Sequence, residues 1–69
     1  MSDEAGLRVT MRDCLRAGFC ATGTRAWMRA HGYDYRAFVR NGLPVEEMAK
    51  WGDAQADMTV AAARERARG

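Results

Sequence analysis

The sequence predicts an all-α fold, a compact bundle of four or five short helices. Helix-forming residues dominate the composition, with 13 alanines and ten arginines among 69 residues, whereas β-branched residues are scarce. Glycine followed by an apolar residue, a common way for a helix to end, occurs at Gly18, Gly32 and Gly42. Arginine pairs four residues apart recur between these stops, and this is the spacing of one helical face.

The chain length allows one small helical domain, which we expect over residues 9–69 after a flexible leader of residues 1–8. Alanine accounts for much of the 48% hydrophobic content, which leaves only 20 larger apolar side chains, five of them methionine. At about 25 cal/mol per Å² of buried apolar surface, such a core barely offsets the chain entropy lost on folding. We therefore expect a domain that is marginal alone, forms a homodimer, or docks on a partner.

The first three helices are predicted from their caps. Thr10 can cap the first helix, with Asp13 at the third helical position of a capping box, and Gly18 ends it. The second helix is expected from residue 20 or 21 to residue 31. Asp34 can cap a short third helix over residues 35–41.

The remaining segment predicts one helix or two. Pro44 suits the first turn of the fourth helix, where Glu46 and Glu47 complement its positive end. Gly52 either interrupts this helix or is a close crossing point inside it, and Asp53 would then cap a fifth helix. Residues 54–67 are rich in alanine, which favours close helix packing but supplies little burial energy.

Each of the first three helices carries two arginines four residues apart. At about 100° per residue, the residue midway between such a pair points to the opposite face. Cys14, Trp27 and Phe38 occupy these midway positions and are therefore expected to face the core. The repetition is explained either by amphipathic helices with arginine on the polar side or by an internal duplication.

The charge distribution is uneven. Seven arginines accompany two acidic residues between positions 5 and 42, whereas one lysine accompanies four acidic residues between positions 43 and 63. Arginine forks suit carboxylates and phosphates, although a high-GC genome would give the same preference for arginine over lysine. The first half of the chain therefore predicts a basic surface.

No pattern in the sequence predicts catalysis, a metal or a cofactor. Cys14 and Cys20 have a C-x5-C spacing with His31 as the single histidine, which is not a zinc pattern. No phosphate loop or nucleotide fingerprint is present, and no convincing third group would orient His31 for a thiol nucleophile. The sequence also contains no signal peptide or membrane span, so we expect a cytoplasmic, non-enzymatic protein with reduced thiols.

Two binding functions fit this chain. The first is a protein-interaction module that uses an arginine-rich contact face. The alternative is a small helix-turn-helix-like DNA-binding protein that places its third helix in the groove. Against this alternative, the third helix is barely two turns long and Met28 occupies a position that usually holds a small residue. The expected contact residues are Arg12, Arg16, Arg25, Arg29, Tyr35, Arg36 and Arg40.

The run G-x-R-A-W-x-x-x-H-G-x-D-x-x-x-F-x-x-x-G-x-P-x-E-x-x-x-x-x-G-D-A, over residues 23–54, resembles a set of small phage and prophage proteins. The resemblance also includes R-A-G-F-C at residues 16–20 and therefore covers most of the chain. That group has no assigned activity, so the resemblance implies no site residue. It implies a mobile-element product that binds and obstructs a host protein or nucleoprotein complex in a bacterial cytoplasm, as anti-CRISPR proteins do.

Overall fold

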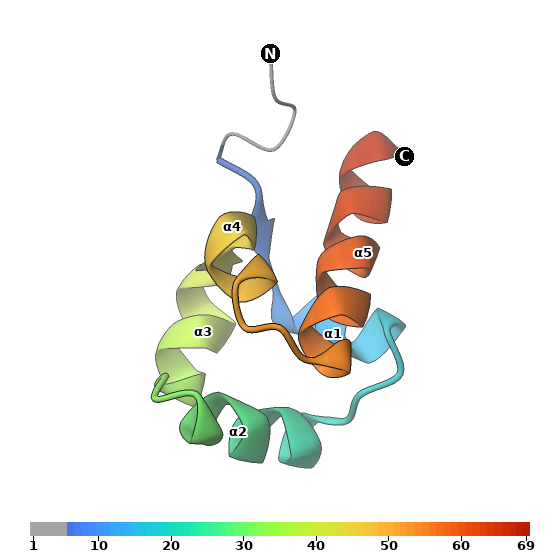
Figure 1. Cartoon of the computed structure of the whole chain (residues 1–69). Coiled ribbons are helices and arrows are strands. Elements are labelled where there is room, and N and C mark those ends of the chain that lie inside the picture. The colour runs from blue at the N-terminus through green and yellow to red at the C-terminus, as the bar shows by residue number, and fades with distance from the viewer. Residues whose placement is uncertain (1–5) are drawn as a thin grey trace.

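The computed structural model describes residues 6–69, and this part of the chain forms five helices and a two-stranded sheet. Figure 1 shows α5 along one side, α3 and α4 along the other, and α2 across the bottom. The prediction of a mainly helical fold is confirmed. The elements in chain order are β1 (Arg8–Val9), α1 (Met11–Arg16), α2 (Ala21–Ala30), α3 (Tyr35–Asn41), β2 (Leu43–Pro44), α4 (Val45–Ala49) and α5 (Ala54–Arg68).

The predicted helix starts are confirmed by side-chain caps. Thr10 and Asp13 form a capping box at α1, in which each side chain accepts from the other residue's backbone N–H. Asp34 accepts from the backbone N–H of Ala37 at the start of α3. Asp53 caps α5, so the segment after Pro44 forms two separate helices. Pro44 itself precedes α4 as its N-cap residue, one position earlier than predicted.

Gly18 and Gly32 end α1 and α2 as predicted. At each stop, the N–H of the residue after the glycine donates to a carbonyl five residues back: Phe19 to Cys14 at 3.0 Å and Tyr33 to Met28 at 2.9 Å. This bond is the signature of the Schellman motif, which satisfies carbonyls that would otherwise be unpaired at the helix end. The spacing of glycines therefore determines the short lengths of the first two helices.

The all-α prediction missed the small sheet. Strands β1 and β2 pair antiparallel, and the two residues at the buried side of the ladder, Val9 and Leu43, lie opposite each other. Gly42 makes this approach possible, because its φ is +71° and a Cβ there would lie 2.7 Å from the Val9 carbonyl oxygen. Each strand has two residues, which is too short for an alternating pattern to be visible in the sequence.

The predicted leader extends too far along the chain. Arg8 belongs to β1 and donates from Nε to the Asn41 carbonyl at 2.6 Å. The Leu7 carbonyl accepts from the backbone N–H of Val45 at 3.2 Å. Residues 1–5 of the predicted leader lie outside the described residues.

A buried polar cluster lies where α1, α2 and α5 meet. The hydroxyls of Thr24 and Thr59 lie near the Cys14 sulfur, and neither hydroxyl has a hydrogen-bond partner within residues 6–69. Burial raises the pKa of the Cys14 thiol to about 11, so this thiol stays protonated at neutral pH. Apart from this cluster and Asp13, the buried residues are apolar: Val9, Met28, Phe38, Leu43, Val45, Met48, Ala56, Val60 and Ala63.

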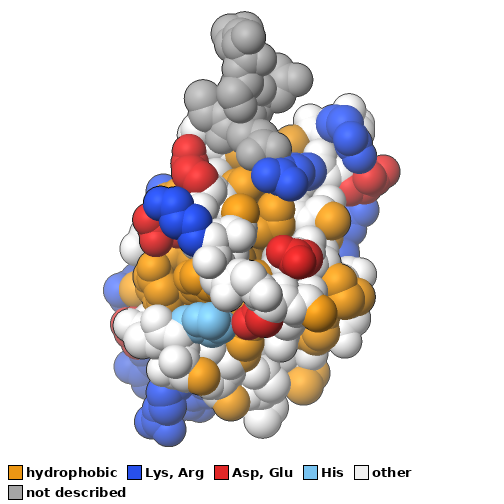
Figure 2. Space-filling view, in the orientation of Figure 1, with side chains coloured by type: hydrophobic (Ala, Val, Ile, Leu, Met, Phe, Trp, Pro, Cys, Tyr) orange, Lys and Arg blue, Asp and Glu red, His pale blue; other side chains and the backbone are white. Residues whose placement is uncertain are grey.

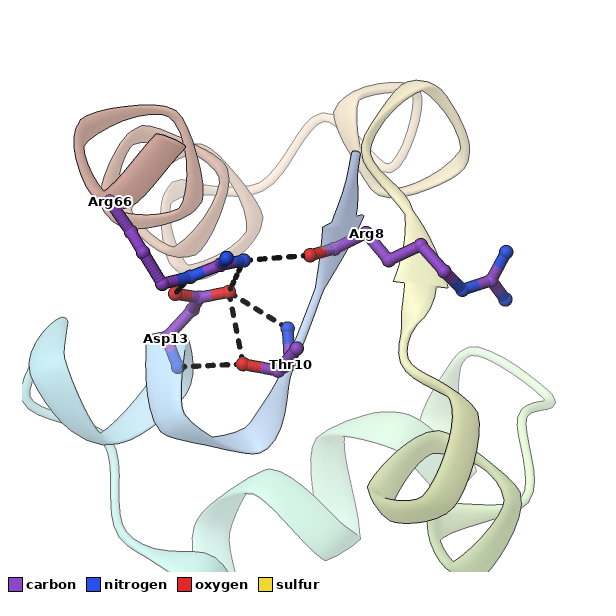
Figure 3. A network of polar contacts seen from close by, with 4 residues as sticks. All are labelled: Arg8, Thr10, Asp13 and Arg66. Atoms are coloured by element: carbon purple, nitrogen blue, oxygen red, sulfur yellow. Dashed lines mark hydrogen bonds and ion pairs between the residues drawn. The ribbon is translucent and has the colours of Figure 1, made fainter. Parts of the chain in front are cut away.

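A buried ion pair joins the two ends of the described chain (Figure 3). Asp13 is fully buried, and Arg66 donates to its two carboxylate oxygens from Nε at 2.8 Å and from Nη2 at 2.9 Å. Arg66 Nη2 also donates to the Arg8 carbonyl at 2.9 Å. Thr10 supplies two further donors to Asp13, its backbone N–H at 2.8 Å and its hydroxyl at 3.2 Å. These contacts connect β1, α1 and α5 around one carboxylate.

The Asp13 carboxylate has a lowered pKa. Burial acts to raise its pKa, but the hydrogen bonds from Arg66 and Thr10 and the charge of Arg66 outweigh that effect. A lowered native pKa contributes stability above the unfolded-state value, and this contribution is lost as the pH falls through the native value.

We predict that Arg66→Ala lowers the free energy of unfolding by about 3 kcal/mol at pH 7, because it leaves a buried carboxylate without its counter-ion. A domain of this size is stable by roughly 3–10 kcal/mol, so the loss would be easily measured by urea unfolding. Arg68→Ala is the matched control, since Arg68 makes only an exposed pair with Glu65. The difference between wild type and Arg66→Ala should shrink below about pH 4 as Asp13 becomes protonated. Equal effects of the two substitutions would contradict this account.

We predict that the two cysteines differ sharply in reactivity. Cys20 is exposed, whereas Cys14 is buried and has a pKa of about 11. At pH 8 only about 0.1% of a thiol with that pKa is ionised, and the thiolate is the reactive form. Intact mass after iodoacetamide treatment should show one adduct in the folded protein and two in denaturant. The Cys20→Ser variant should remain unlabelled while folded, and rapid native labelling of that variant would refute the buried position.

Candidate interaction surface

The six arginines predicted to form a contact face are all exposed. They lie in pairs on α1, α2 and α3, on the side of each helix that faces solvent. The residues midway between the pairs point inward as predicted: Cys14 and Phe38 are buried, and Trp27 is half-buried against the core. The predicted orientation of the three helices, with arginines outward and the midway residue inward, is therefore confirmed. The six are Arg12, Arg16, Arg25, Arg29, Arg36 and Arg40.

These six guanidinium groups have no hydrogen bond or ion pair with another side chain or carbonyl within residues 6–69. The other arginines differ. Arg8 binds the carbonyls of Asn41 and Gly42, Arg66 binds Asp13, and Arg68 binds Glu65. Arg64 also has an interaction partner. The fold thus uses the arginines at its two ends and leaves those on α1–α3 available.

Part of the predicted face forms a shallow hollow between α2 and α3. Arg25, Asp34, Tyr35 and Arg36 line a space of about 250 Å³. Figure 2 shows basic side chains gathered around the corner of α2 and α3. Tyr35 is half-buried, and its hydroxyl points to the Met11 sulfur at 3.7 Å, so the ring is held between α3 and α1. The hollow therefore combines two exposed guanidinium groups and one carboxylate with a fixed aromatic ring.

Exposed aliphatic side chains accompany two of the arginine pairs. Val39 is 48% exposed on α3, one residue before Arg40 and three after Arg36. Leu15 is 55% exposed and stands in the same relation to the pair on α1. Val39 and Arg36, like Leu15 and Arg12, are three residues apart and are therefore neighbours on one helical face. Each face therefore offers apolar surface next to charged donors, a combination that suits a protein partner.

The seven predicted residues do not form one continuous hollow. Arg25, Tyr35 and Arg36 lie together, whereas Arg16 lines a different groove between α1 and α5. Sequence spacing places residues on the face of a helix, but it does not determine how the helices turn their faces relative to one another. The structure thus separates an α2–α3 group from an α1 group.

A second cluster was not predicted from the sequence. The His31 ring stacks on Trp51 with centroids 4.0 Å apart, and Trp27 meets Trp51 edge-on at 4.9 Å. The Asp53 carboxylate accepts from Trp27 Nε1 at 3.0 Å and lies 3.0 Å from His31 Nε2. In Figure 2 the histidine is visible beside an acidic group and hydrophobic side chains. His31 does end α2 as predicted, but its ring faces α5.

Asp53 has several roles at once. Its Oδ1 accepts from the Ala56 backbone N–H at 2.6 Å, while its Oδ2 serves Trp27 and His31. Burial acts to raise the pKa of Asp53, but the hydrogen bonds from Trp27, Ala56 and His31 lower it below its usual value. Both carboxylate oxygens are occupied by groups of the chain itself. The cluster is therefore a bridge between α2 and α5, and Asp53 is not poised as a general base.

Comparison with models of known protein families, with curated proteins and with solved structures gives no significant match. Among residues 6–69, no group of three or more His, Cys, Asp or Glu side chains is placed to bind a metal ion. Within the same range, no helix combines the length and apolar character needed to cross a membrane. The exposed arginine surface is the remaining candidate functional site.

We predict that Asp53→Ala lowers the free energy of unfolding by about 2 kcal/mol, because it removes the α5 cap and leaves the Trp27 indole N–H unpaired. Asp53→Asn should lower the free energy of unfolding by less than Asp53→Ala, because asparagine caps helices as well as aspartate does. Some loss should remain, because the asparagine side chain has only one acceptor oxygen. Urea unfolding followed by tryptophan fluorescence measures both. Asp57→Ala is the control in the first turn of α5, and a loss equal to that of Asp53→Ala would contradict the bridging role.

Proposed function

We propose that this protein is a non-enzymatic interaction module that binds an acidic surface of a macromolecular partner through its α2–α3 arginines. One observation supports this proposal above the others: the arginines on α1–α3 are exposed and have no partner within residues 6–69, whereas those at the ends of the fold are paired. No internal bond has to break before these groups bind a partner. The core of the proposed contact is Arg25, Arg29, Tyr35, Arg36 and Arg40.

The chemistry of the surface suits carboxylates or phosphates. A guanidinium group can donate two parallel hydrogen bonds to either anion, and such charge-assisted bonds are stronger than neutral ones. Tyr35 adds a large ring whose position is already fixed, so little side-chain entropy is lost when a partner covers it. The exposed Val39 adds apolar area at the same face. We favour an acidic protein surface because of this apolar component.

A protein that binds its partner in this way could act as an inhibitor. In the phage setting that the sequence resemblance implies, a small module could occupy an acidic or nucleic-acid-binding surface of a host complex and obstruct it. The anti-CRISPR-like role belongs to this proposal as one form of obstruction.

Direct DNA binding through α3 is the second candidate. It is favoured by the arrangement of α2, a four-residue connection and α3, with Arg36 and Arg40 both exposed on α3. Helix α3 has only seven residues, a length of about 10 Å at 1.5 Å per residue. That length limits the number of base edges it can reach in a major groove.

We predict that the double variant Arg25→Glu/Arg36→Glu loses partner capture by at least about tenfold, since each reversal places repulsion where an attractive pair stood. The measurement is quantitative mass spectrometry of proteins retained from a bacterial lysate by the tagged protein. Lys50→Glu is the control, because it reverses one positive charge at an exposed position outside the α2–α3 surface. Lys50 is the C-cap residue of α4. Partners retained equally by both variants would overturn the proposal.

A titration with random-sequence duplex DNA distinguishes the two candidates. DNA binding should weaken steeply as salt rises, with a slope set by the number of phosphates contacted. If the DNA reading holds, fluorescence anisotropy at low salt will show binding that Arg36→Glu and Arg40→Glu abolish. If no DNA binding is detected at low salt, direct DNA binding is rejected and binding to a protein partner remains the proposal.

A further inference from the structure

The groove between α1 and α5 is an apolar surface distinct from the α2–α3 hollow. It is a shallow depression of about 470 Å³, open to solvent and lined by Arg16, Ala17, Met58, Ala61, Ala62 and Glu65. The four α5 residues follow one another at intervals of three, one and three, so they form one stripe on that helix. Alanine at the centre of the stripe allows another helix to approach closely.

Apolar exposure concentrates around this groove. In residues 6–69 only three large hydrophobic side chains are strongly exposed, and two of them, Leu15 at 55% and Met58 at 51%, lie on the two helices that form the groove. Met58 stands within the groove lining itself. Covering such side chains in a contact would remove apolar surface from water at about 25 cal/mol per Å².

The charges at the groove are self-complementary. Arg16 and Glu65 both line it, and they form no ion pair with each other in the described chain. Glu65 makes only an exposed pair with Arg68, three residues away on the same helix. In a two-fold symmetric dimer, a contact between residue i of one chain and residue j of the other also occurs between residue j of the first chain and residue i of the second. An Arg16–Glu65 contact would therefore form twice across one interface.

We propose that the α1–α5 groove is a self-association surface that a second copy of this chain covers. Helix α5 packs antiparallel against α5 of the second copy, with Ala61 and Ala62 at the two-fold axis. Met58 then lies against the methylene groups of the second copy's Glu65, whose carboxylate is available to Arg16. The occupant is a second copy because one groove supplies both charges and the small central residues that the symmetric contact needs.

Sedimentation velocity tests this proposal at protein concentrations from roughly 1 µM to 1 mM, the range in which weak and moderate dimers dissociate. The wild-type protein should change from monomer to dimer over this range. Ala61→Glu should remain monomeric, since it places a bulky charge at the symmetry axis. Ala61 is exposed and glutamate is a good helix former, so the variant should keep its fold by circular dichroism. Ala67→Glu adds the same charge to α5 outside the groove lining and should dimerise normally.

Charge reversal tests the pairing itself. Arg16→Glu and Glu65→Arg should each raise the dimer dissociation constant by roughly tenfold, because each brings like charges together twice. The double variant restores opposite charges and should recover most of the affinity. A wild-type protein that stays monomeric throughout the range would overturn the proposal. Dimerisation of the Ala61→Glu variant would also overturn it. So would a double charge-reversal variant whose dimer is weakened by the sum of the two single effects instead of being restored.

Discussion

The placement of one buried carboxylate organises this fold. Asp13 is fully buried and would be costly to hold there alone, because a charge removed from water needs both a counter-ion and hydrogen bonds. Arg66 supplies the counter-ion and Thr10 supplies the remaining donors. Since Arg66 also binds the Arg8 carbonyl, the strand, the first helix and the last helix meet at this point. The small apolar core is thereby supplemented by a polar junction that fixes the direction of α5.

Features encoded within a few residues could be predicted from the sequence. The capping box of Thr10 and Asp13, the cap of Asp34 and the glycine stops all depend on local hydrogen bonds, so their residue types and spacing suffice. Long-range partners could not be predicted in the same way. Arg66 lies 53 positions from Asp13, and the paired strands lie at opposite sides of three helices in the chain. The periodic pattern of apolar and polar residues along the sequence does not indicate such long-range contacts.

The same distinction holds for the candidate site. The helical spacing of arginines correctly predicted that they face solvent opposite Cys14 and Phe38. This spacing did not show which arginines form hydrogen bonds or ion pairs within the fold, because those bonds depend on carboxylates and carbonyls that the tertiary structure brings near. Nor did it show that the Tyr35 hydroxyl turns to Met11, or that His31 reaches Asp53. Trp27, which was expected to face the core, lies half-buried against it and contacts both Trp51 and Asp53.

The separation of Asp13 and Arg66 along the chain has a consequence during protein synthesis. The first helix can form its capping box as soon as it leaves the ribosome, but its carboxylate then has no cation to neutralise it. Arg66 is synthesised 53 residues after Asp13, so burial of Asp13 with this counter-ion must wait until the chain has been made that far. Because non-local contacts form only after the entropy of closing the intervening loop is overcome, this junction forms later than the local contacts of the first helix. The joining of α5 to α1 and β1 therefore follows the formation of the first helix.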